Sequence, residues 1–96
     1  MAEHIDYQKQ NNLLKVLKVL ANANRLKVAK FLAETKNGSA TVTEIANATS
    51  IAENNLSNHL KLMRIAKVLK AKQSGVYMHY SINDPLVFSI VSLLGD

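Results

Sequence analysis

An unusual group of polar side chains lies between Asn54 and Arg64, in the stretch NNLSNHLKLMR. Three asparagines, a serine, a histidine and two cations are interspersed there with Leu56, Leu60 and Met63. Asparagine is a poor helix former, because its amide competes with the backbone for hydrogen bonds. An amide can donate and accept at once, which matches the major-groove edge of adenine, while serine pairs with several bases and cations bind phosphates. These residue types therefore suit contacts with duplex DNA.

Helical geometry would separate these polar side chains from the apolar ones. A helix advances about 100° per residue, so a helix over 52–67 places Leu56, Leu60 and Met63 on one buried stripe. The opposite side, with Asn55 at its edge, presents amides, a hydroxyl and an ammonium from Asn54, Ser57, Asn58 and Lys61. A polar stripe on its own is more often a solvated helix surface, so the neighbouring elements have to decide between the two interpretations.

Two amphipathic helices are predicted before this segment. Apolar residues recur with helical spacing over 6–20 and again over 26–32. The sequence ANAN at 21–24 is predicted to separate the two helices. The sequence NG at 37–38 is predicted to end the second one, because glycine readily takes the left-handed conformation that follows a helix end.

A short helix and a β-hairpin flank the polar segment. Thr41 and Glu44 form a predicted capping box that opens the short helix. After the polar segment, Ser74-Gly75 is predicted to be a two-residue hairpin turn. Residues predicted to alternate onto one face of the second strand are Val76, Met78, Tyr80 and Ile82. Residues 86–94 then predict a last helix that is apolar almost all round.

The predicted order is helix, helix, short helix, helix, hairpin, helix. A short helix, a tight turn, a longer helix and a following β-hairpin form a winged helix-turn-helix. The expected fold class is therefore mainly α with a β-hairpin wing. One domain is expected over 1–96, because no repeat, low-complexity tract or linker divides the chain. In that fold the polar segment is the recognition helix.

Composition narrows the classes of function. The 96 residues carry a net charge of +5, and no acidic residue lies between Glu53 and Asp84. The chain has no cysteine, which excludes disulfides, zinc-thiolate sites and thiol redox switches within it. It has no apolar run of about 20 residues and no signal-peptide core, so a cytoplasmic location is expected. No carboxylate pair, nucleophile–base spacing or phosphate-binding loop indicates an enzyme, and no cofactor is expected.

Several residues allow more than one interpretation. His59 lies near the edge of the apolar stripe, where a packed histidine that bonds a phosphate is a commoner arrangement than a ligand or a catalytic group. Tyr77 and Tyr80 are more typical of hairpin packing than of base stacking. Lys70 and Lys72 are either solvated strand charges or phosphate contacts.

Three segments carry a resemblance to a known family: LKVLANANRLKVAKFL at 17–32, TEIANATSIAENNLSNHLKLMRIAKVLK at 43–70 and SGVYMHYSINDP at 74–85. They resemble the ArsR/SmtB family of bacterial winged-helix repressors. The resemblance implies a homodimer, joined by the first and last helices, that binds an imperfect inverted repeat and represses transcription. The apolar last helix favours a dimer independently. By the resemblance, the base-reading positions fall on Glu53, Asn54, Asn55, Ser57 and Asn58, and the family's common histidine on His59.

The chain departs from the family pattern at its metal sites. The family's thiolate motif falls on Thr41 and Thr43, which are poor ligands for soft metals. No Asp, Glu or His lies within 86–94, so the family's other common metal site is also missing. The remaining candidates, His4, His79 and Asp84, are scattered along the sequence. A metal-responsive function is therefore not predicted.

Other departures concern DNA binding. Ala52 stands where the family often has a capping serine; Ser50 with Glu53 offers an alternative capping box. Ser50 also replaces a common turn glycine, so the turn is expected to be either slightly strained or differently shaped. In the wing, Val76 and Ser81 occupy places often taken by arginine. In any contact between the wing tip and the minor groove, Lys72 and Gln73 are expected to take the place of those arginines.

The sequence therefore predicts a homodimeric, DNA-binding transcriptional repressor without a membrane contact. Its partners would be double-stranded DNA and a second copy of the chain. The sequence leaves open whether release depends on an unidentified small-molecule or protein effector, on a metal, or only on the abundance of the protein. The residues predicted to contact DNA are Glu53, Asn54, Asn55, Ser57, Asn58, His59, Lys61, Arg64, Lys70, Lys72 and Gln73. The alternative is a winged helix that binds protein, in which the basic surface meets an acidic partner and the last helix is a docking surface.

Overall fold

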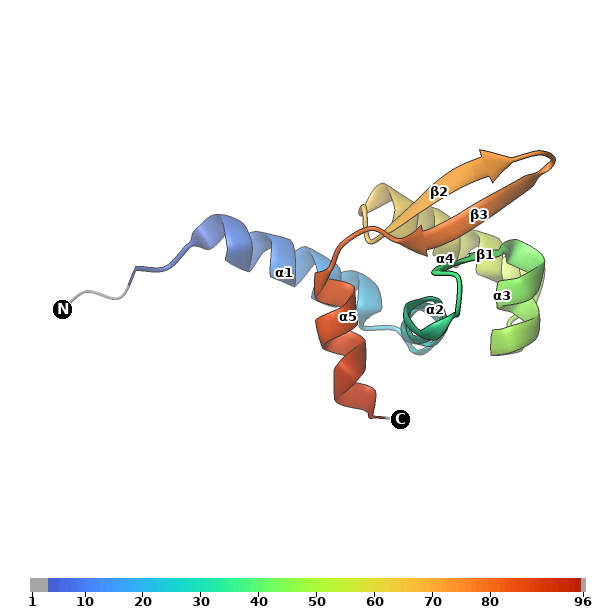
Figure 1. Cartoon of the computed structure of the whole chain (residues 1–96). Helices are drawn as coiled ribbons and strands as arrows, with labels where there is room; N and C mark the ends of the chain where they lie inside the picture. Colours follow the sequence, from blue (N-terminus) through green and yellow to red (C-terminus); the bar gives the residue numbers. More distant parts are fainter. Residues whose placement is uncertain (1–3, 96) are drawn as a thin grey trace.

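Figure 1 shows the computed structural model, which describes residues 4–95 as helices packed on one face of a small antiparallel sheet. The elements follow the chain as α1 (Tyr7–Leu20), α2 (Ala23–Glu34), β1 (Ser39–Thr41), α3 (Val42–Thr49), α4 (Glu53–Ile65), β2 (Leu69–Ser74), β3 (Tyr77–Ile82), α5 (Leu86–Val91) and a 3-10 turn, Ser92–Leu94. The predicted winged helix-turn-helix is confirmed, with one strand more than expected. Across the described residues, no helix is long and apolar enough to cross a membrane.

The first two helices begin at side-chain caps. Asp6 caps α1, since its Oδ1 accepts hydrogen bonds from the backbone N–H groups two and three residues further on. Asn22 caps α2 by accepting from the N–H of Arg25 at 3.0 Å. The break predicted at 21–24 is therefore shorter, because the Asn22 amide starts α2 at Ala23.

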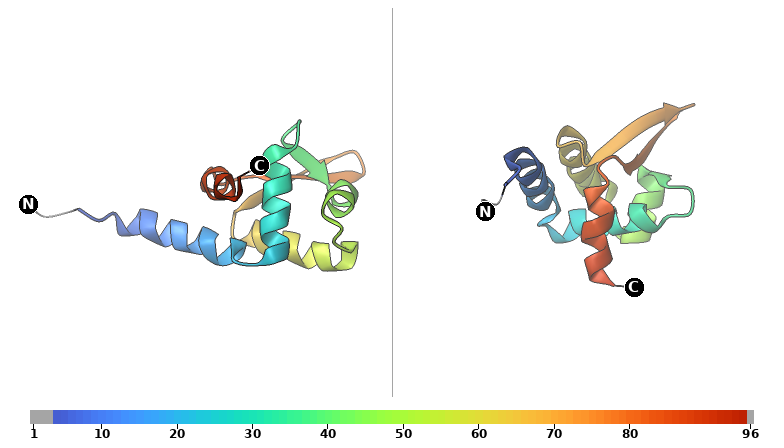
Figure 2. Two further views of the ribbon diagram at one scale, coloured as in Figure 1. Left: turned by 90° about the horizontal axis from the view of Figure 1, so that it is seen from below. Right: turned by 60° about the vertical axis from the view of Figure 1, so that its left-hand side comes forward.

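α2 lies at the centre of the core. It contacts α1, α3, α4, α5 and β3, and Figure 2 shows α5 packed beside it. The largest fully buried side chains are Leu32, Ile45, Leu56, Leu60, Met63, Leu69, Val16, Val28, Val68 and Val87. The helices and the wing thus share one core, which fixes α4 relative to its neighbours.

α3 begins at the predicted capping box, which is confirmed. The Thr41 hydroxyl accepts from the Glu44 N–H at 3.3 Å, and the Glu44 carboxylate accepts from the Thr41 N–H at 2.8 Å. The hydrogen bond from the Thr41 backbone, followed by that with its hydroxyl, lowers the pKa of the Glu44 carboxyl. α3 ends at Ser50, whose φ of 59° is the left-handed conformation. The turn into α4 therefore carries the expected strain of a non-glycine residue in that region.

α4 begins later than the predicted 52–67 and without a side-chain cap. Its N-cap residue is Ala52, which has no polar atom beyond the backbone. The predicted capping box between Ser50 and Glu53 is wrong. Ser50 is instead the left-handed residue that closes α3, and no side chain within 4–95 caps the start of α4. The backbone turn and the packing of α4 therefore determine where this helix starts.

A Schellman motif ends α4. The N–H of Val68 donates to the carbonyl oxygen of Met63, and the N–H of Lys67 to that of Arg64, both at 2.9 Å. Lys67 has a φ of 62°, the left-handed conformation that this motif requires. The helix thus stops at Ile65, two residues before the predicted end.

The three strands are antiparallel and lie in the order β1-β3-β2. β1 is absent from the predicted order, because its three residues, SAT, carry no alternation that a local pattern could reveal. The pairing of Ala40 with Tyr80 and its neighbours makes this segment a strand. β3 is therefore the central strand of the sheet.

The hairpin turn lies one residue further along than predicted. Ser74 pairs with Tyr77, so the two loop residues are Gly75 and Val76. Gly75 has a φ of 63°, which a two-residue hairpin loop favours at its first position. Val76 is 85% exposed in the turn, so its predicted place on the strand face is wrong. The other residues predicted for that face lie in β3.

Candidate nucleic-acid interface

One side of α4 is anchored in the core and the other faces solvent. Leu56, Leu60 and Met63 are 0%, 1% and 0% exposed, which confirms the predicted buried stripe. Burying side chains of this size stabilises the fold by about 1.5–3 kcal/mol each. The predicted contact residues that are exposed on α4 are Glu53, Asn54, Asn55, Ser57, Asn58, Lys61 and Arg64. We name Asn54, Ser57, Asn58 and Lys61 the polar face of α4.

An internal hydrogen bond orients Ser57 on the polar face. Its hydroxyl donates to the carbonyl oxygen of Glu53 at 3.0 Å. The single hydroxyl proton is then used, and the oxygen keeps its lone pairs as acceptors. An amino group on adenine or cytosine is the matching partner in the major groove. The exposed amides of Asn54 and Asn58 offer both a donor and an acceptor beside it.

His59 is half-buried at the edge of the polar face, next to Arg25 of α2. Arg25 Nη1 lies 3.4 Å from His59 Nδ1, and Arg25 Nε donates to the carbonyl oxygen of Val19 at 2.6 Å. Because a guanidinium can only donate, this contact is a hydrogen bond in the tautomer whose Nδ1 accepts, and that tautomer carries its proton on Nε2. This geometry gives His59 an N–H donor of the kind that the predicted phosphate contact needs.

Arg25 is a site residue that the sequence analysis missed. It lies 34 residues before His59, on an amphipathic helix where a lone arginine is usually a solvated charge. Its guanidinium joins the end of α1, at Val19, to the middle of α4. No spacing along the chain signals this contact, because only the packing of α2 against α4 brings the two residues together.

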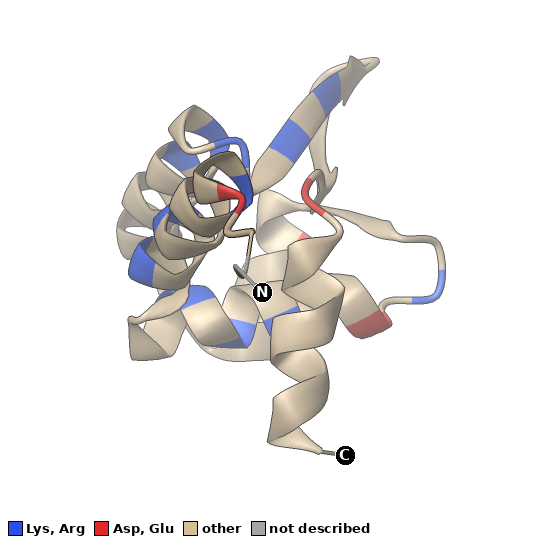
Figure 3. Cartoon of the chain, turned by 90° about the vertical axis from the view of Figure 1, so that its left-hand side faces the viewer, with Lys and Arg blue, Asp and Glu red and all other residues tan. Residues whose placement is uncertain are grey.

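The wing contributes two lysines and a glutamine. Lys70 and Lys72 are exposed on β2, and Gln73 Nε2 donates to the carbonyl oxygen of Gly75 at 3.3 Å, which holds its amide at the turn. Figure 3 shows Lys and Arg on the hairpin and on the helices beside it, and no charged residue on α5. The one ion pair within 4–95 joins two residues of α2. The cations of α4 and β2 therefore have no carboxylate partner among the described residues, and their positive field can attract a polyanion.

The candidate metal ligands do not come together. Thr41 is engaged in the capping box of α3. Asp84 accepts hydrogen bonds from the Asn12 amide at 3.1 Å and from the N–H of Leu86 at 3.0 Å. Within the part of the chain that the structure describes, no three His, Cys, Asp or Glu side chains form a group that could hold a metal ion.

α1 and α5 carry exposed apolar side chains. The two helices contact each other and lie on the side of the molecule away from the hairpin (Figure 2). Large apolar residues that are 38–84% exposed on these helices and on the 3-10 turn after α5 are Leu13, Leu14, Leu17, Phe88, Leu93 and Leu94, which we name the α1/α5 surface. Exposed apolar side chains that gather on one side of a soluble protein mark interaction sites.

Comparison with known proteins identifies the family. The model of the bacterial regulatory protein family arsR matches residues 22–66. The transcriptional repressor PagR of Bacillus anthracis is 36% identical over 90 residues, which cover 94% of this chain and 88% of that protein. Its crystal structure has a TM-score of 0.82 at 34% identity, and the match covers 94% of this chain and 100% of that chain.

Two further relatives show the same relationship. The CadC homologue of Staphylococcus aureus, a cadmium resistance transcriptional regulatory protein, is 31% identical over 88 residues, covering 90% of this chain and 71% of that protein. The solution structure of the homodimeric winged helix-turn-helix DNA-binding domain Mb0332 from Mycobacterium bovis has a TM-score of 0.74 at 27% identity, covering 98% of this chain and 86% of that chain. The chain belongs to the arsR family of bacterial regulatory proteins.

Proposed function

We propose that the protein is a sequence-specific DNA-binding transcriptional repressor that acts in the cytoplasm and has no enzymatic activity. The polar face of α4 carries this proposal: exposed amides and a hydroxyl lie on a helix whose other side is buried. Such a helix fits the major groove, where its side chains can match base edges. The alternative, a winged helix that binds an acidic protein, is less well supported, because the similar proteins are named transcriptional repressors.

The contact residues divide into two groups with different tasks. Glu53, Asn54, Asn55, Ser57 and Asn58 occupy the first turns of α4 and would meet base edges. Residues that would bind phosphates are His59, Lys61 and Arg64 on α4, and Lys70, Lys72 and Gln73 on the wing. The first group then sets the sequence preference, and the second sets the register and the salt dependence.

A second copy of the chain would cover the α1/α5 surface. Its apolar side chains would otherwise remain in water, and burial of apolar area favours association. The Mycobacterium bovis domain is described as homodimeric, which supports the same assembly here. In a two-fold dimer, the two copies of α4 would enter major grooves about one helical turn apart, on an inverted repeat.

We assign the release of DNA to a small molecule or a protein rather than to thiolate-bound metal. The name of the Staphylococcus aureus relative refers to cadmium resistance, whereas this chain has no cysteine. Thr41 and Thr43, at the positions of the family's thiolate motif, bind soft metals poorly. Thr41 also holds the capping box of α3 in place.

Selection of bound duplexes from a random DNA pool tests the proposed function. The expected result is enrichment of a palindromic consensus whose half-sites are about one helical turn apart. The matched control is the N54A/N58A variant, which should retain DNA at low salt without enriching that consensus. A wild-type protein that retains no duplex at low salt would overturn the proposal and favour the protein-binding alternative.

A further inference from the structure

The outer face of the sheet carries two rows of polar side chains. The first row crosses β1, β3 and β2 as Ser39, Ser81 and Lys70, which pair directly in the register of the strands. The second row, two residues along each strand, is Thr41, His79 and Lys72. In the intervening row, Ala40 and Tyr80 pack on the core, while Ala71 is half-buried and contributes to the lining described below. Because side chains alternate across a strand, both polar rows project away from the core.

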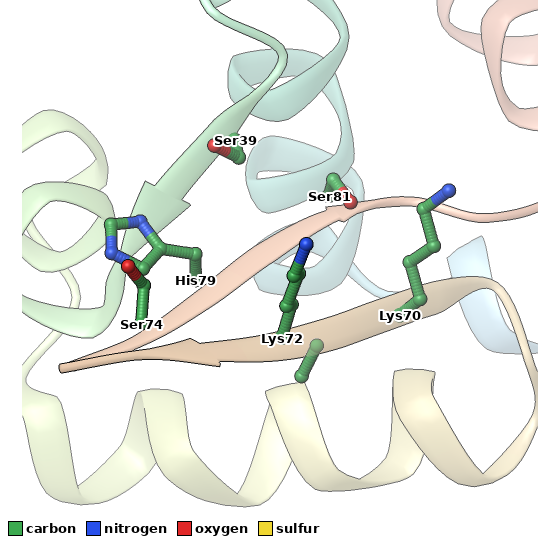
Figure 4. A pocket seen from close by; sticks show the side chains of 7 residues that line it. Ser39, Lys70, Lys72, Ser74, His79 and Ser81 are labelled. Carbon is green, nitrogen blue, oxygen red and sulfur yellow. The ribbon is translucent and has the colours of Figure 1, made fainter. Parts of the chain in front are cut away.

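These rows enclose a shallow trough with a volume of about 470 Å³. We name it the wing trough, and its polar lining consists of Ser39, Lys70, Lys72, Ser74, His79 and Ser81. Figure 4 shows the two lysines projecting from β2, with His79 and Ser81 on β3 and Ser39 on β1 beside them. The trough is hollow because short serines lie next to long lysines on neighbouring strands.

The chemistry of the wing trough favours an anion. Two ammonium groups, an imidazole and hydroxyls line it, and among the described residues its lining includes no carboxylate. Glu44 is the carboxylate whose charge reaches His79: its pKa is lowered chiefly by the Thr41 backbone N–H and, to a small extent, by His79. One oxygen of Glu44 is already engaged with the Thr41 N–H. The trough therefore offers several donors and an excess of positive charge.

We propose that the wing trough binds a phosphate group. The Nζ atoms of Lys70 and Lys72 donate to the phosphate oxygens from one side, and the hydroxyls of Ser39 and Ser81 donate from the other. The rest of the volume accommodates the sugar to which the phosphate is attached. The phosphate comes from one of two sources: the DNA backbone beyond the half-site that α4 reads, or a free phosphorylated sugar. The first source rests on the proposed function, and the second does not.

Titration with inorganic phosphate, followed by NMR without DNA, tests the site itself. Sodium chloride at matched ionic strength is the reference. We expect saturable shifts of the His79 and Ser81 amide signals with phosphate alone. The K70Q/K72Q variant should bind phosphate at least about tenfold more weakly, since a hydrogen bond to a charged group contributes about that factor.

Two further variants separate the trough from general charge. S81V keeps every charge but fills the trough, so it should also weaken phosphate binding. K15Q/K36Q removes two exposed lysines elsewhere and should bind phosphate like the wild type. Equal shifts with phosphate and chloride, or equal losses in K70Q/K72Q and K15Q/K36Q, would overturn the proposal. This result is independent of whether the protein binds an operator.

Two arms distinguish the sources of the phosphate. In the first, operators selected from the random pool are compared with the same operators extended at both ends; a DNA source gives tighter binding to the longer duplex, and K70Q/K72Q removes that gain. In the second, ribose 5-phosphate is titrated; a free-sugar source gives tighter binding than inorganic phosphate and no dependence on duplex length. If neither a length gain nor ribose 5-phosphate binding depends on the trough residues, the proposal is wrong.

Discussion

Lys61→Ala gives the sharpest test of how α4 uses its charges. Lys61 is exposed on the polar face, one turn after the asparagines, and Arg64 follows it on the next turn. The one ion pair of residues 4–95 lies in α2, so the Lys61 ammonium has no carboxylate partner to lose. Removing it should therefore leave the free protein unchanged and remove a phosphate contact from the complex.

The expected magnitude follows from counterion release. Each protomer of a dimer loses one contact, so the complex loses two. The slope of log K against log salt should become less negative by about 1.8, because each phosphate contact on B-DNA contributes about 0.9. If counterion release supplies the whole contribution, the affinity falls about 60-fold at 0.1 M salt but only about 9-fold at 0.3 M. The effect should be the same on operator and scrambled DNA.

Fluorescence anisotropy over a salt series measures this slope directly. Lys36→Ala is the matched control, because Lys36 is an exposed lysine in the loop after α2 and outside the proposed contacts. It removes the same charge and should leave the slope unchanged. The same slope in K61A and the wild type would refute the phosphate role, and a loss confined to the operator would assign Lys61 to base reading instead.

The remaining predictions test the other parts of the structure. Asn54→Ala or Asn58→Ala should cost about 1–3 kcal/mol on the operator and little on scrambled DNA, by anisotropy; equal losses on both duplexes would contradict base reading. Leu17→Asp should give a folded monomer in sedimentation velocity, because it places a charge in the α1/α5 surface, and an unchanged dimer would place the interface elsewhere. Leu60→Ala should lower the free energy of unfolding in urea by about 2–5 kcal/mol, since the side chain is 1% exposed; a near-neutral change would mean that α4 is not anchored there. Glu44→Ala should lower the melting temperature near neutral pH, and the difference should vanish as the pH falls through the lowered pKa of Glu44, because that carboxylate stabilises the fold only while it is ionised; a difference that persists in acid would exclude the capping carboxylate as its cause.

Boundaries that depend on neighbouring residues could be predicted from the sequence. The two partners of the capping box, Thr41 and Glu44, are three positions apart in the sequence. Their two side chains are therefore sufficient to specify it. The same reasoning failed for Ser50, because the preceding helix already fixes its backbone. Its N–H donates to the carbonyl oxygen of Ala46 at 2.9 Å, which commits Ser50 to the end of α3.

Features that depend on distant partners could not be predicted in the same way. β1 is a strand only because β3 lies beside it, and no property of SAT alone requires this. The hairpin turn differs from its prediction by one residue, because the register is fixed where Leu69 pairs with Ile82 and both pack on the core. A shift of one residue would turn the opposite strand face to the core, so packing overrides the local turn signal.

Helical periodicity predicted which side of α4 is exposed, but not which atoms that side offers. Within the described residues, Ser57, His59 and Gln73 each form one internal contact: to the Glu53 carbonyl, to Arg25 and to the Gly75 carbonyl. Each contact uses one hydrogen-bonding group and so selects what remains for a partner. While its bond holds, Ser57 can accept from a base amino group but cannot donate to a base carbonyl, and His59 can donate but not accept. If α4 reads bases as proposed, its sequence preference therefore depends on hydrogen bonds made inside the protein before any DNA arrives.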